Sequence, residues 1–470
     1  MTTATEPLSF TQQHFGNVDL GHKARNRCFS KIADLIGRHP GGTLPDKLQS
    51  PKDYRAMDRL MNRKEVTHAA ILDAHVERTL ERLRQCDGPV LLVHDTTELD
   101  YTGLLSMPDL GFIGDGRGRG YLCHNSLAVD PQRHEAIGLV HQILHKRAAV
   151  GKTEGVAAKR ARASRESRLW TNAIQALEPA PAGKLWVDVA DRGADIFEFL
   201  AALQAQDRHY VVRACHNRSI GIGHGAEPTK SLLYSYARSL PAGGHQTLTV
   251  ASADGERKTT VALSYAPVQV NPPHVRRGLY DKRPLRAWVV RIWEVTPAAG
   301  AQPLEWVLLT NVVVNSMAAA WERMSWYKGR WVIEEFHKAQ KTGCGIEKLQ
   351  FTTEAALQPM IALLSVVAVT LLNLRRASRD EDAKTRPANE VVHQDYVAVL
   401  SAWRYKKEVR LEMSVHDFFY ALARLGGHQN RKSDKRPGWL VLWRGWMKLQ
   451  SMVDGAEAIG STGYKIRGQS

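Results

Sequence analysis

The 470-residue sequence predicts a mixed α/β fold with helical regions at both ends and a β-rich stretch in between. Helical periodicity dominates residues 1–70 and returns in the last hundred or so residues, whereas short apolar runs typical of strands begin near residue 89. Residues 219–305 are rich in Gly, Pro, Thr and Val and alternate in polarity, which predicts further strands. At roughly 150 residues per domain, the length favours about three structural units.

Composition and charge narrow the class of protein. Hydrophobic residues make up 43% and charged residues 24% of the chain, which is typical of globular proteins and excludes wholesale disorder. The chain has 64 Lys and Arg against 48 Asp and Glu, a net charge of +16. This excess favours a polyanionic partner such as nucleic acid, with an anionic membrane surface as the competing interpretation.

The chain has no pattern typical of export or of membrane insertion. The N-terminus lacks a basic segment followed by an apolar run, so we expect the protein to stay in the cytoplasm. The longest apolar run, residues 360–374, is short and interrupted by polar side chains, which predicts a buried core helix and no membrane span. Five scattered cysteines without a C-x-x-C pair predict reduced thiols and no cysteine zinc site.

A basic helix is predicted near the N-terminus, from Asp19 to Ile36. At 100° per residue, Lys23, Arg27 and Lys31 share an arc of about 80°, and the opposite side carries apolar residues. Arg25 falls on the apolar side and weakens the pattern. A solvated face would look the same, but the positive charge of the whole chain favours contact with DNA phosphates.

The central region predicts the element order βββαβαβ. Strands are expected at 89–95, 120–130 and 136–144, where three successive strands imply a meander. The remaining elements in this order are a basic helix at 159–177, a strand at 184–191, a helix at 193–203 and a strand at 209–214. Beyond the β-rich stretch we expect a strand at 304–312, then helices, a polar linker at 375–387 and two amphipathic helices near the C-terminus.

Two aspartates are placed for chemistry. Asp95 and Asp191 each end a predicted apolar strand, where a side chain can leave the core and face a cleft. If these two strands pair, the carboxylates are adjacent in space. Each aspartate taken singly could equally be a turn or helix-capping residue.

A charged stripe is predicted on the helix through residues 327–341. Tyr327, Arg330, Glu334 and Lys341 fall within an arc of about 60°, opposite the apolar residues, whereas Glu335 lies off the stripe. A solvated, salt-bridged face would have the same pattern, since Arg330 and Glu334 are an i,i+4 pair.

Three strings together resemble one family. H-D-T-T-E-L-D-Y around Asp95, V-A-D-R-G-A-D-I around Asp191 and Y-x-x-R-x-x-x-E-x-x-x-x-x-x-K from Tyr327 to Lys341 are similar to the bacterial cut-and-paste DDE transposases of the insertion-sequence-4 family. Their order and separations also fit that family, which has an RNase H-like catalytic core. The resemblance implies a DNA-end-binding region at 1–70, a catalytic core at 71–374 with a β-rich insertion at 219–305, and a dimerisation region at 375–470.

The resemblance also implies a metal site. Asp95 would bridge two Mg²⁺ ions, for which Mn²⁺ could substitute, while Asp191 and Glu334 would each hold one. Carboxylate oxygens are hard ligands that suit these ions. Two ions roughly 3.5 to 4 Å apart can activate the attacking water or 3′-hydroxyl and neutralise the charge that develops on the phosphate.

Further residues would contact DNA by the same resemblance. Tyr327, Arg330 and Lys341 would bind phosphates beside the scissile bond, with Arg330 giving bidentate geometry. Trp306 stands where the family tends to place an aromatic side chain that stacks on an extruded base, although a tryptophan in an apolar strand is usually a core residue. Arg213 resembles a position near the same base.

The sequence thus predicts a bacterial, nucleoid-associated transposase. It would bind the terminal inverted repeats of its element as double-stranded DNA, cut both strands and join the 3′-hydroxyl ends to target DNA as a homodimer. No G-x-x-x-x-G-K-[ST] loop is present, so no nucleotide cofactor is expected. Two alternatives stay open, a nuclease of the same fold that does not join ends and an inactive DNA-binding regulator.

Overall fold

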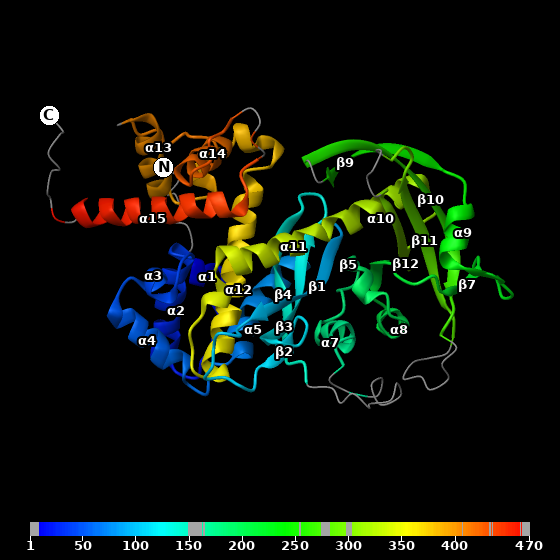
Figure 1. Cartoon of the computed structure of the whole chain (residues 1–470), viewed down its shortest axis with the longest axis horizontal. Coiled ribbons are helices and arrows are strands. Elements are labelled where there is room, and N and C mark those ends of the chain that lie inside the picture. Colours follow the sequence, from blue (N-terminus) through cyan, green and yellow to red (C-terminus); the bar gives the residue numbers. More distant parts are fainter. Residues whose placement is uncertain are drawn as a thin grey trace. The chain divides into compact units, whose positions relative to one another are not determined.

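The computed structural model describes residues 9–148, 162, 165–252, 255–273, 283–297, 303–406, 408–431, 434, 436–460 and 462. Within these residues the protein is a mixed α/β structure with one large mixed sheet and helical ends (Figure 1). The chain divides into two compact units, the first formed by residues 1–78, 103–108 and 335–470 and the second by 79–102 and 109–334. The domain boundaries predicted at residues 70 and 374 stay a prediction.

The second unit contains a twelve-stranded sheet. Its order is β2-β3-β1-β5-β6-β12-β11-β10-β7-β8, with β4 paired to β3 and β9 paired to β10. The strands are β1 (Val90–Asp100), β2 (Gly111–Ile113), β3 (Gly118–Asp130), β4 (Glu135–His145), β5 (Trp186–Ala190), β6 (His209–Arg213), β7 (Ser219–Ile222), β8 (Thr229–Leu232), β9 (Gly244–Ser252), β10 (Gly255–Val270), β11 (Leu285–Glu294) and β12 (Glu305–Thr310).

The meander predicted from three apolar runs is confirmed. β1, β3 and β4 are successive antiparallel neighbours, and β5 and β6 follow on the other side of β1 as parallel strands. Two details differ from the prediction. The short strand β2 intervenes between β1 and β3. β1 also continues to Asp100, because its polar second half pairs with β3 from Thr96↔His124 to Asp100↔Gly120.

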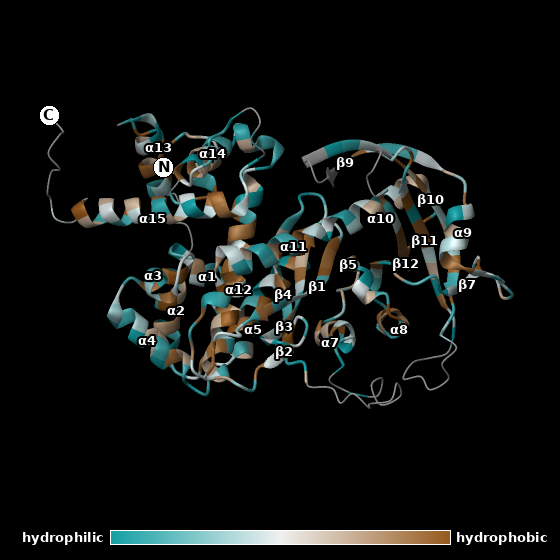
Figure 2. Cartoon of the chain, in the orientation of Figure 1, coloured by the Kyte–Doolittle hydropathy of each residue, from teal (hydrophilic) through white to brown (hydrophobic). Residues whose placement is uncertain are grey.

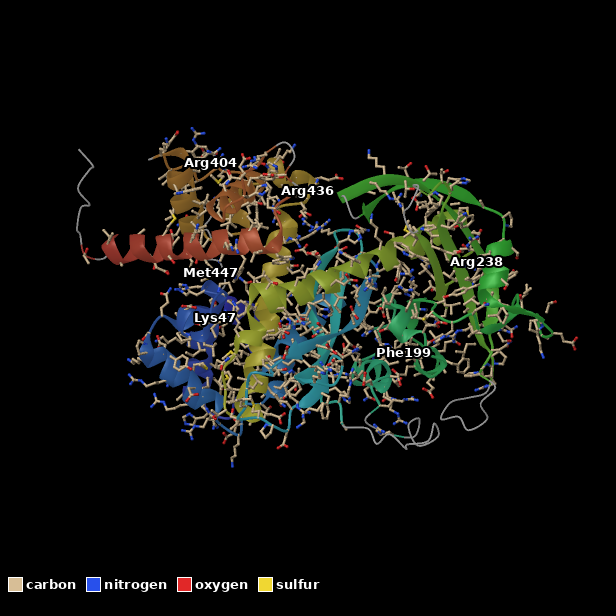
Figure 3. All side chains as sticks on the ribbon, in the orientation of Figure 1. Lys47, Phe199, Arg238, Arg404, Arg436 and Met447 are labelled. Carbon is tan, nitrogen blue, oxygen red and sulfur yellow. The ribbon has the colours of Figure 1, made fainter. Side chains whose placement is uncertain are left out.

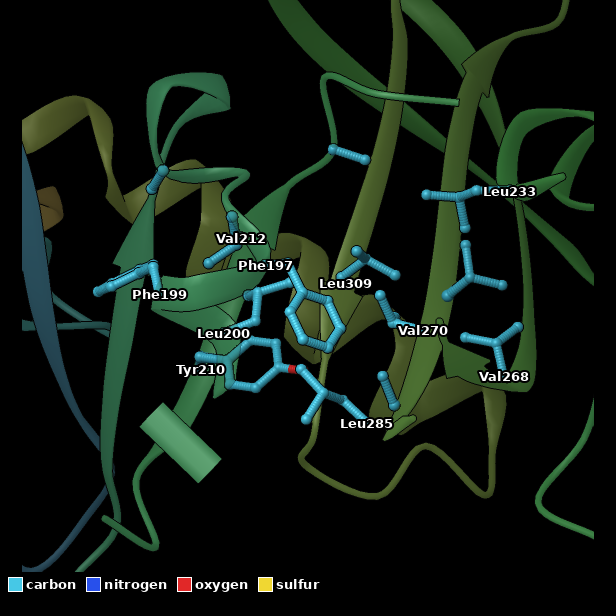
Figure 4. Packing of buried hydrophobic residues seen from close by; sticks show 14 of the residues in the cluster. Phe197, Phe199, Leu200, Tyr210, Val212, Leu233, Val268, Val270, Leu285 and Leu309 are labelled. Carbon is cyan, nitrogen blue, oxygen red and sulfur yellow. The ribbon is translucent and has the colours of Figure 1, made fainter. Parts of the chain in front are cut away.

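Helices cover both faces of this sheet. The helices of the second unit are α7 (Arg168–Ala176), α8 (Phe197–Ala205), α9 (Leu233–Ser239) and α10 (Met317–Gly329). α7 and α8 pack on the face that carries Ala190 and Val212, and Figure 4 shows Phe197 and Leu200 of α8 among the strand residues of that core. α10 lies on the opposite face, where Gly329 allows a close approach to β1: a Cβ there would come within 2.8 Å of Leu91.

Two helices in this unit differ from what the sequence indicates. The helix expected at 159–177 is described only from Arg168, and residues 159–161, 163 and 164 lie outside the described residues. The β-rich stretch, which shows little helical pattern in the sequence, contains α9. Its seven residues include buried Leu233 and Ala237, which pack into the sheet's core. A helix this short carries too few apolar repeats for its period to be recognised in the sequence.

The first unit is helical. Its elements are α1 (Phe10–His14), α2 (Lys23–Arg38), α3 (Leu44–Leu48), α4 (Pro51–Met61), most of α5 (His68–Gln85), the end of α11 (Trp331–Lys338), α12 (Glu354–Ala377), α13 (Gln394–Tyr405), α14 (Val415–Leu425) and α15 (Trp439–Gly460). The predicted faces of α2 are confirmed, since Phe29, Ile32, Ala33 and Ile36 are buried while Lys23, Arg27 and Lys31 are exposed.

The core helix predicted from the apolar run is also confirmed. Among the described helices, α12 is the one long and apolar enough to cross a membrane, and 83% of its most apolar window is buried inside the protein. Figure 2 shows the apolar colouring along this helix. The predicted polar linker at 375–387 overlaps the end of α12 and a 3₁₀ turn at Glu381–Lys384. The five cysteines are free, as expected.

The N-terminal helical region and α15 are in contact within the first unit. A Cβ on Gly41 would overlap the side chains of Trp443 and Met447 of α15, and Gln49 donates a hydrogen bond to Asp454 over 2.8 Å. Figure 3 labels Met447 on α15 together with Lys47 of α3.

Glycines also bring α14 and α15 together. A Cβ on Gly445 would overlap the carbonyl oxygen of Leu422, and a Cβ on Gly426 would overlap that of Val441. The two predicted amphipathic helices therefore bury part of their surface against each other within one chain.

Candidate functional site

Asp95 and Asp191 lie side by side on neighbouring strands. β1 and β5 are parallel, and their pairing runs from Val90↔Trp186 to His94↔Ala190, so the two aspartates follow directly after the last pair. The condition set by the sequence, that their strands pair, is therefore met. The prediction that Asp95 ends its own strand is wrong, because β1 continues to Asp100; Asp95 stands one residue beyond the last pair between β1 and β5.

Backbone amides orient both carboxylates. The N–H of Thr96 donates to Asp95 Oδ1 over 2.8 Å, and the N–H of Gly193 donates to Asp191 Oδ1 over 2.7 Å. Asp191 also caps the 3₁₀ turn Arg192–Ala194. The capping interpretation of Asp191 is therefore correct, and it leaves the second carboxylate oxygen available for another partner.

The segment from Tyr327 to Lys341 is not the single regular helix assumed from the sequence. α10 ends at Gly329, α11 begins at Trp331, and a π-helical turn follows at Ala339–Gly343. At the first break the N–H of Arg330 bonds to the carbonyl of Tyr327, three residues back. A constant 100° per residue therefore does not describe this segment, and the angle predicted for Lys341 is wrong.

Arg330 connects the helix to the sheet. Its guanidinium lies 2.6 Å from Glu334 Oε1 and 3.8 Å from Asp95 Oδ2, and the residue is only 9% exposed. The i,i+4 pair anticipated from the sequence is present, but it is buried against β1 instead of forming a solvated face. Glu334 is thereby held near Asp95.

The electrostatics of Asp95 show how close the acidic groups are. Burial and, after it, the charge of Asp191 raise the pKa of Asp95 to about 6; the charge of Glu334 also raises it, whereas the Thr96 N–H and Arg330 lower it. The carboxylates of Asp191, after the end of β5, and of Glu334 on α11 thus both lie close enough to Asp95 to act on it. Among the described residues no three His, Cys, Asp or Glu side chains are already gathered as a metal-binding group.

Glu335 has different partners from Glu334. Its carboxylate pairs with Arg375 and Lys338 and accepts a hydrogen bond from Trp439 Nε1 over 2.7 Å. All of these residues belong to the first compact unit, whereas Glu334 belongs to the second. The neighbouring glutamates therefore have separate roles, and that of Glu335 is to join α11 to α12 and α15.

Tyr327, Trp306 and Arg213 form one contact group. The rings of Trp306 and Tyr327 meet edge to face with centroids 5.1 Å apart, and Arg213 donates to the carbonyl of Glu305, next to Trp306, over 3.0 Å. The Arg330 guanidinium lies 5.8 Å from the centre of the Tyr327 ring. These four predicted residues are thus linked through successive contacts to Asp95.

The remaining predicted residues belong to the first unit. Lys341 lies in the π-helical turn and pairs with Glu347 over 3.2 Å. Lys23 and Arg27 are exposed on α2, whereas Lys31 on the same face pairs with Asp53 of α4 over 2.5 Å.

A cavity of about 580 Å³ lies beside α7, and neither Asp95 nor Asp191 lines it. Thr96 and Gly193, whose amides hold Asp95 and Asp191, both line it, together with Trp170 and Arg147. Gly193 keeps this space open, since a Cβ there would lie 3.3 Å from the Trp170 ring.

Two nearby residues were not identified from the sequence as part of this site. Asn125 of β3 is buried directly opposite Asp95, and its side-chain oxygen accepts a hydrogen bond from Gln142 over 2.7 Å. His94 of β1, which precedes Asp95, is fully buried and bonded to Asp188. The sequence feature that could have indicated these buried polar contacts is the polar run His124-Asn125-Ser126 inside an otherwise apolar strand.

Residues 7–66 match the model of a family described as transposase DNA-binding. The match supports a DNA-binding transposase. It covers α1 to α4 and includes the exposed basic residues of α2. Double-stranded DNA is therefore the partner that the N-terminal helices indicate, in agreement with the net charge of +16.

Proposed function

We propose that the protein is a cut-and-paste DDE transposase of the insertion-sequence-4 type. It would bind the terminal inverted repeats of its element, cleave both strands and join the 3′-hydroxyl ends to target DNA. The observation that supports this proposal is that Asp95 and Asp191 follow the last residue pair of two parallel strands, while Arg330 contacts both Asp95 and Glu334. The N-terminal match to transposase DNA-binding supports the same function independently.

The sheet topology supports an RNase H-like core. The order β4-β3-β1-β5-β6 has three antiparallel strands followed by two strands parallel to β1. Between β6 and β12 the chain adds β7 to β11, which would be the insertion typical of this family. In this arrangement the two aspartates come from the central strands, and the glutamate comes from the helix after the insertion.

The residues of the site fit divalent metal ions. Asp95, Asp191 and Glu334 offer hard oxygen ligands. Burial and the charge of Asp191 raise the pKa of Asp95 to about 6, and bound cations would favour the ionised carboxylate. These three residues would hold Mg²⁺, or Mn²⁺ in its place. Bound there, the ions would supply Lewis acidity and a water of lowered pKa.

The chain's own residues would position the DNA. Arg330 now bridges Glu334 and Asp95, and its planar guanidinium suits bidentate contact with a phosphate. Tyr327 and Lys341 would contact phosphates of the same strand. Trp306, held edge-on by Tyr327, would stack on an extruded base.

Binding and assembly would use the first unit. Lys23, Arg27 and Lys31 would contact the phosphates of the element ends, which the N-terminal match supports. A homodimer assembled through the C-terminal helices α13 to α15 would hold two ends together.

The test is metal-dependent cleavage of duplex DNA carrying the element's end. Asp95→Ala, Asp191→Ala and Glu334→Ala should each lower the cleavage rate at least about a thousandfold while the protein still binds the DNA, because each removes roughly 4 kcal/mol or more of transition-state stabilisation. Glu335→Gln is the matched control, since it changes the adjacent carboxylate and should retain most activity. Cleavage by any of the three alanine variants at the wild-type rate would refute the assignment.

The same substrate separates the two alternatives. Pre-cleaved ends are joined to target DNA by a transposase and left unjoined by a nuclease. End binding without any metal-dependent cleavage identifies an inactive regulator.

A further inference from the structure

A second group of charges lies beneath the candidate site. His94 and Asp188 are 0% and 1% exposed, and His94 Nε2 lies 2.8 Å from Asp188 Oδ1. The other ring nitrogen of His94 lies 2.8 Å from Ser126 Oγ. Arg208 binds Asp188 through two hydrogen bonds, of 2.9 and 3.1 Å. We call His94, Ser126, Asp188 and Arg208 the buried polar cluster.

The buried polar cluster ties together the four strands around the site. Ser126 is on β3 directly opposite His94 of β1, Asp188 is on β5, and Arg208 immediately precedes β6. Asp188 pairs with Leu92, so it reaches His94 diagonally across the β1–β5 pair. Every strand that positions Asp95 and Asp191, and both neighbours of those strands, is therefore joined by this cluster.

The cluster and the acidic site lie on opposite faces of the sheet. Adjacent residues of a strand point to opposite sides, so His94 and Asp95 face away from each other. His94 and Asp188 share the face of Ala190, which α7 and α8 cover, whereas Asp95 shares the face of Leu91, against which Gly329 of α10 packs. The cluster therefore contacts neither the DNA nor the ions of the proposed reaction.

Arg208 is itself firmly held. Its Nη1 donates to the carbonyl of Glu178 over 3.1 Å, and its own carbonyl accepts from Asn311 Nδ2 over 2.8 Å. Asn311 also accepts from the N–H of Tyr210 on β6 over 2.9 Å. The position of Asp188, and through it that of His94, is thus determined by groups on both sides of β5.

We propose that the buried polar cluster positions Asp95 and Asp191 relative to each other. A slip of one residue between strands would turn Asp95 to the wrong face. Residues Val90–Val93 are apolar and buried on both faces of the sheet, so no alternation of polarity in this run defines the register. Directional bonds from His94 to Asp188 and Ser126 define one register. His94, Asp188 and Arg208 are therefore positioning residues for the proposed metal site, an inference that rests on the proposed function.

The test measures metal binding directly. The full chain, bound to element-end DNA, is titrated with Mn²⁺ and free Mn²⁺ is followed by electron paramagnetic resonance. His94→Leu removes both bonds of the ring but leaves Asp188 paired with Arg208, so the protein should fold. The half-saturating Mn²⁺ concentration should rise about tenfold or more, as is typical when groups that orient metal ligands are lost.

Two further variants distinguish positioning from plain stability. His94→Gln keeps a donor for Asp188 and should return half-saturation to within about threefold of the wild type. Glu294→Gln is the matched control, because Glu294 of β11 is an equally buried carboxylate held by Arg257 and Thr259 away from the site. It should lower the melting temperature without changing Mn²⁺ binding.

Mn²⁺ half-saturation and the melting temperature together separate the possible outcomes. The proposal is overturned if His94→Leu lowers the melting temperature like Glu294→Gln and leaves Mn²⁺ half-saturation unchanged. Failure of the underlying function gives a different result, since Asp95→Asn would then bind Mn²⁺ as the wild type does.

Discussion

Asp95 and Asp188 are both carboxylates in the centre of one sheet, yet their environments act in opposite directions. Burial and the charge of Asp191 raise the pKa of Asp95 to about 6. Burial alone would raise the pKa of Asp188 as well, but Arg208 and His94 outweigh it and hold this pKa below its ordinary value. Two acidic groups on opposite faces of neighbouring strands thus end up as an uncompensated site and a fully paired one.

The difference shows that burial raises the pKa of both carboxylates and that their partners decide the net direction. Asp188 has a bidentate guanidinium and an imidazole at hydrogen-bonding distance. Asp95 has one backbone donor and a guanidinium 3.8 Å away that is shared with Glu334. The first arrangement stabilises the strands, whereas the second lowers stability and leaves negative charge that the proposed metal ions would neutralise.

The largest expected effect on stability comes from removing the charge of Asp188, the carboxylate that is fully paired. Asp188→Asn removes the charge that compensates Arg208, and an uncompensated buried charge costs roughly 3 to 5 kcal/mol. Urea denaturation of the full chain should show this loss. A loss below about 1 kcal/mol would mean that Arg208 finds another partner and that the two aspartates are less different than they look.

Asp95→Asn, in contrast to Asp188→Asn, should stabilise the protein. An acid whose pKa rises from 3.8 to about 6 on folding costs roughly 3 kcal/mol once it is ionised. Because the pKa of Asp95 is higher in the folded protein, folding carries no such cost below about pH 4, where the acid is protonated in both states. The free energy of unfolding then falls as the pH rises to about 6. Asp95→Asn should therefore gain up to roughly 3 kcal/mol at pH 7 and almost nothing at pH 4, without added metal.

Urea denaturation at several pH values checks this prediction. Asp188→Asn, measured alongside, serves as the control, because its loss should persist at pH 7 where the Asp95→Asn gain is complete. Equal stability of Asp95→Asn and wild type at both pH values would contradict the raised pKa.

Arg208 and Arg330, the arginines beside Asp188 and Asp95, can be compared by replacing each with glutamine. Arg208→Gln leaves Asp188 charged and buried, whereas Arg330→Gln leaves Glu334 half-exposed and able to meet water. We expect Arg330→Gln to cost only about 1 kcal/mol, less than Arg208→Gln. It should also move the pH dependence associated with Asp95 to higher pH, because one of the groups that lowers its pKa is gone.

The smallest effects on stability should come from exposed charges. Arg27→Gln is expected to change stability by less than about 0.5 kcal/mol, and to lower the slope of log affinity against log salt for end DNA by about one. Lys31→Gln should change the slope less, since Lys31 already pairs with Asp53. Affinity measured at several salt concentrations tests both, and equal slopes for the two variants would contradict this reasoning.

Features with a local cause were predicted well. The apolar face of α2, the buried run within α12 and the three strands of the meander follow from the period of apolar residues, which the sequence displays directly. Short elements such as β2 and α9 were not predicted, because three to seven residues show no period. The break at Arg330 and the π-turn were missed for a different reason, since packing decides such irregularities.

The sequence by itself determined the candidate acids, their order along the chain, the basic N-terminal face and the separation of Glu334 from Glu335. Only the tertiary structure decided that Asp95 and Asp191 are adjacent and that Arg330 bridges two carboxylates. It also decided that His94, Asp188 and Arg208 join the same strands on the opposite face of the sheet. Strand pairing and buried ion pairs connect residues about a hundred positions apart. Their geometry depends on the whole sheet, so no local pattern in the sequence encodes it.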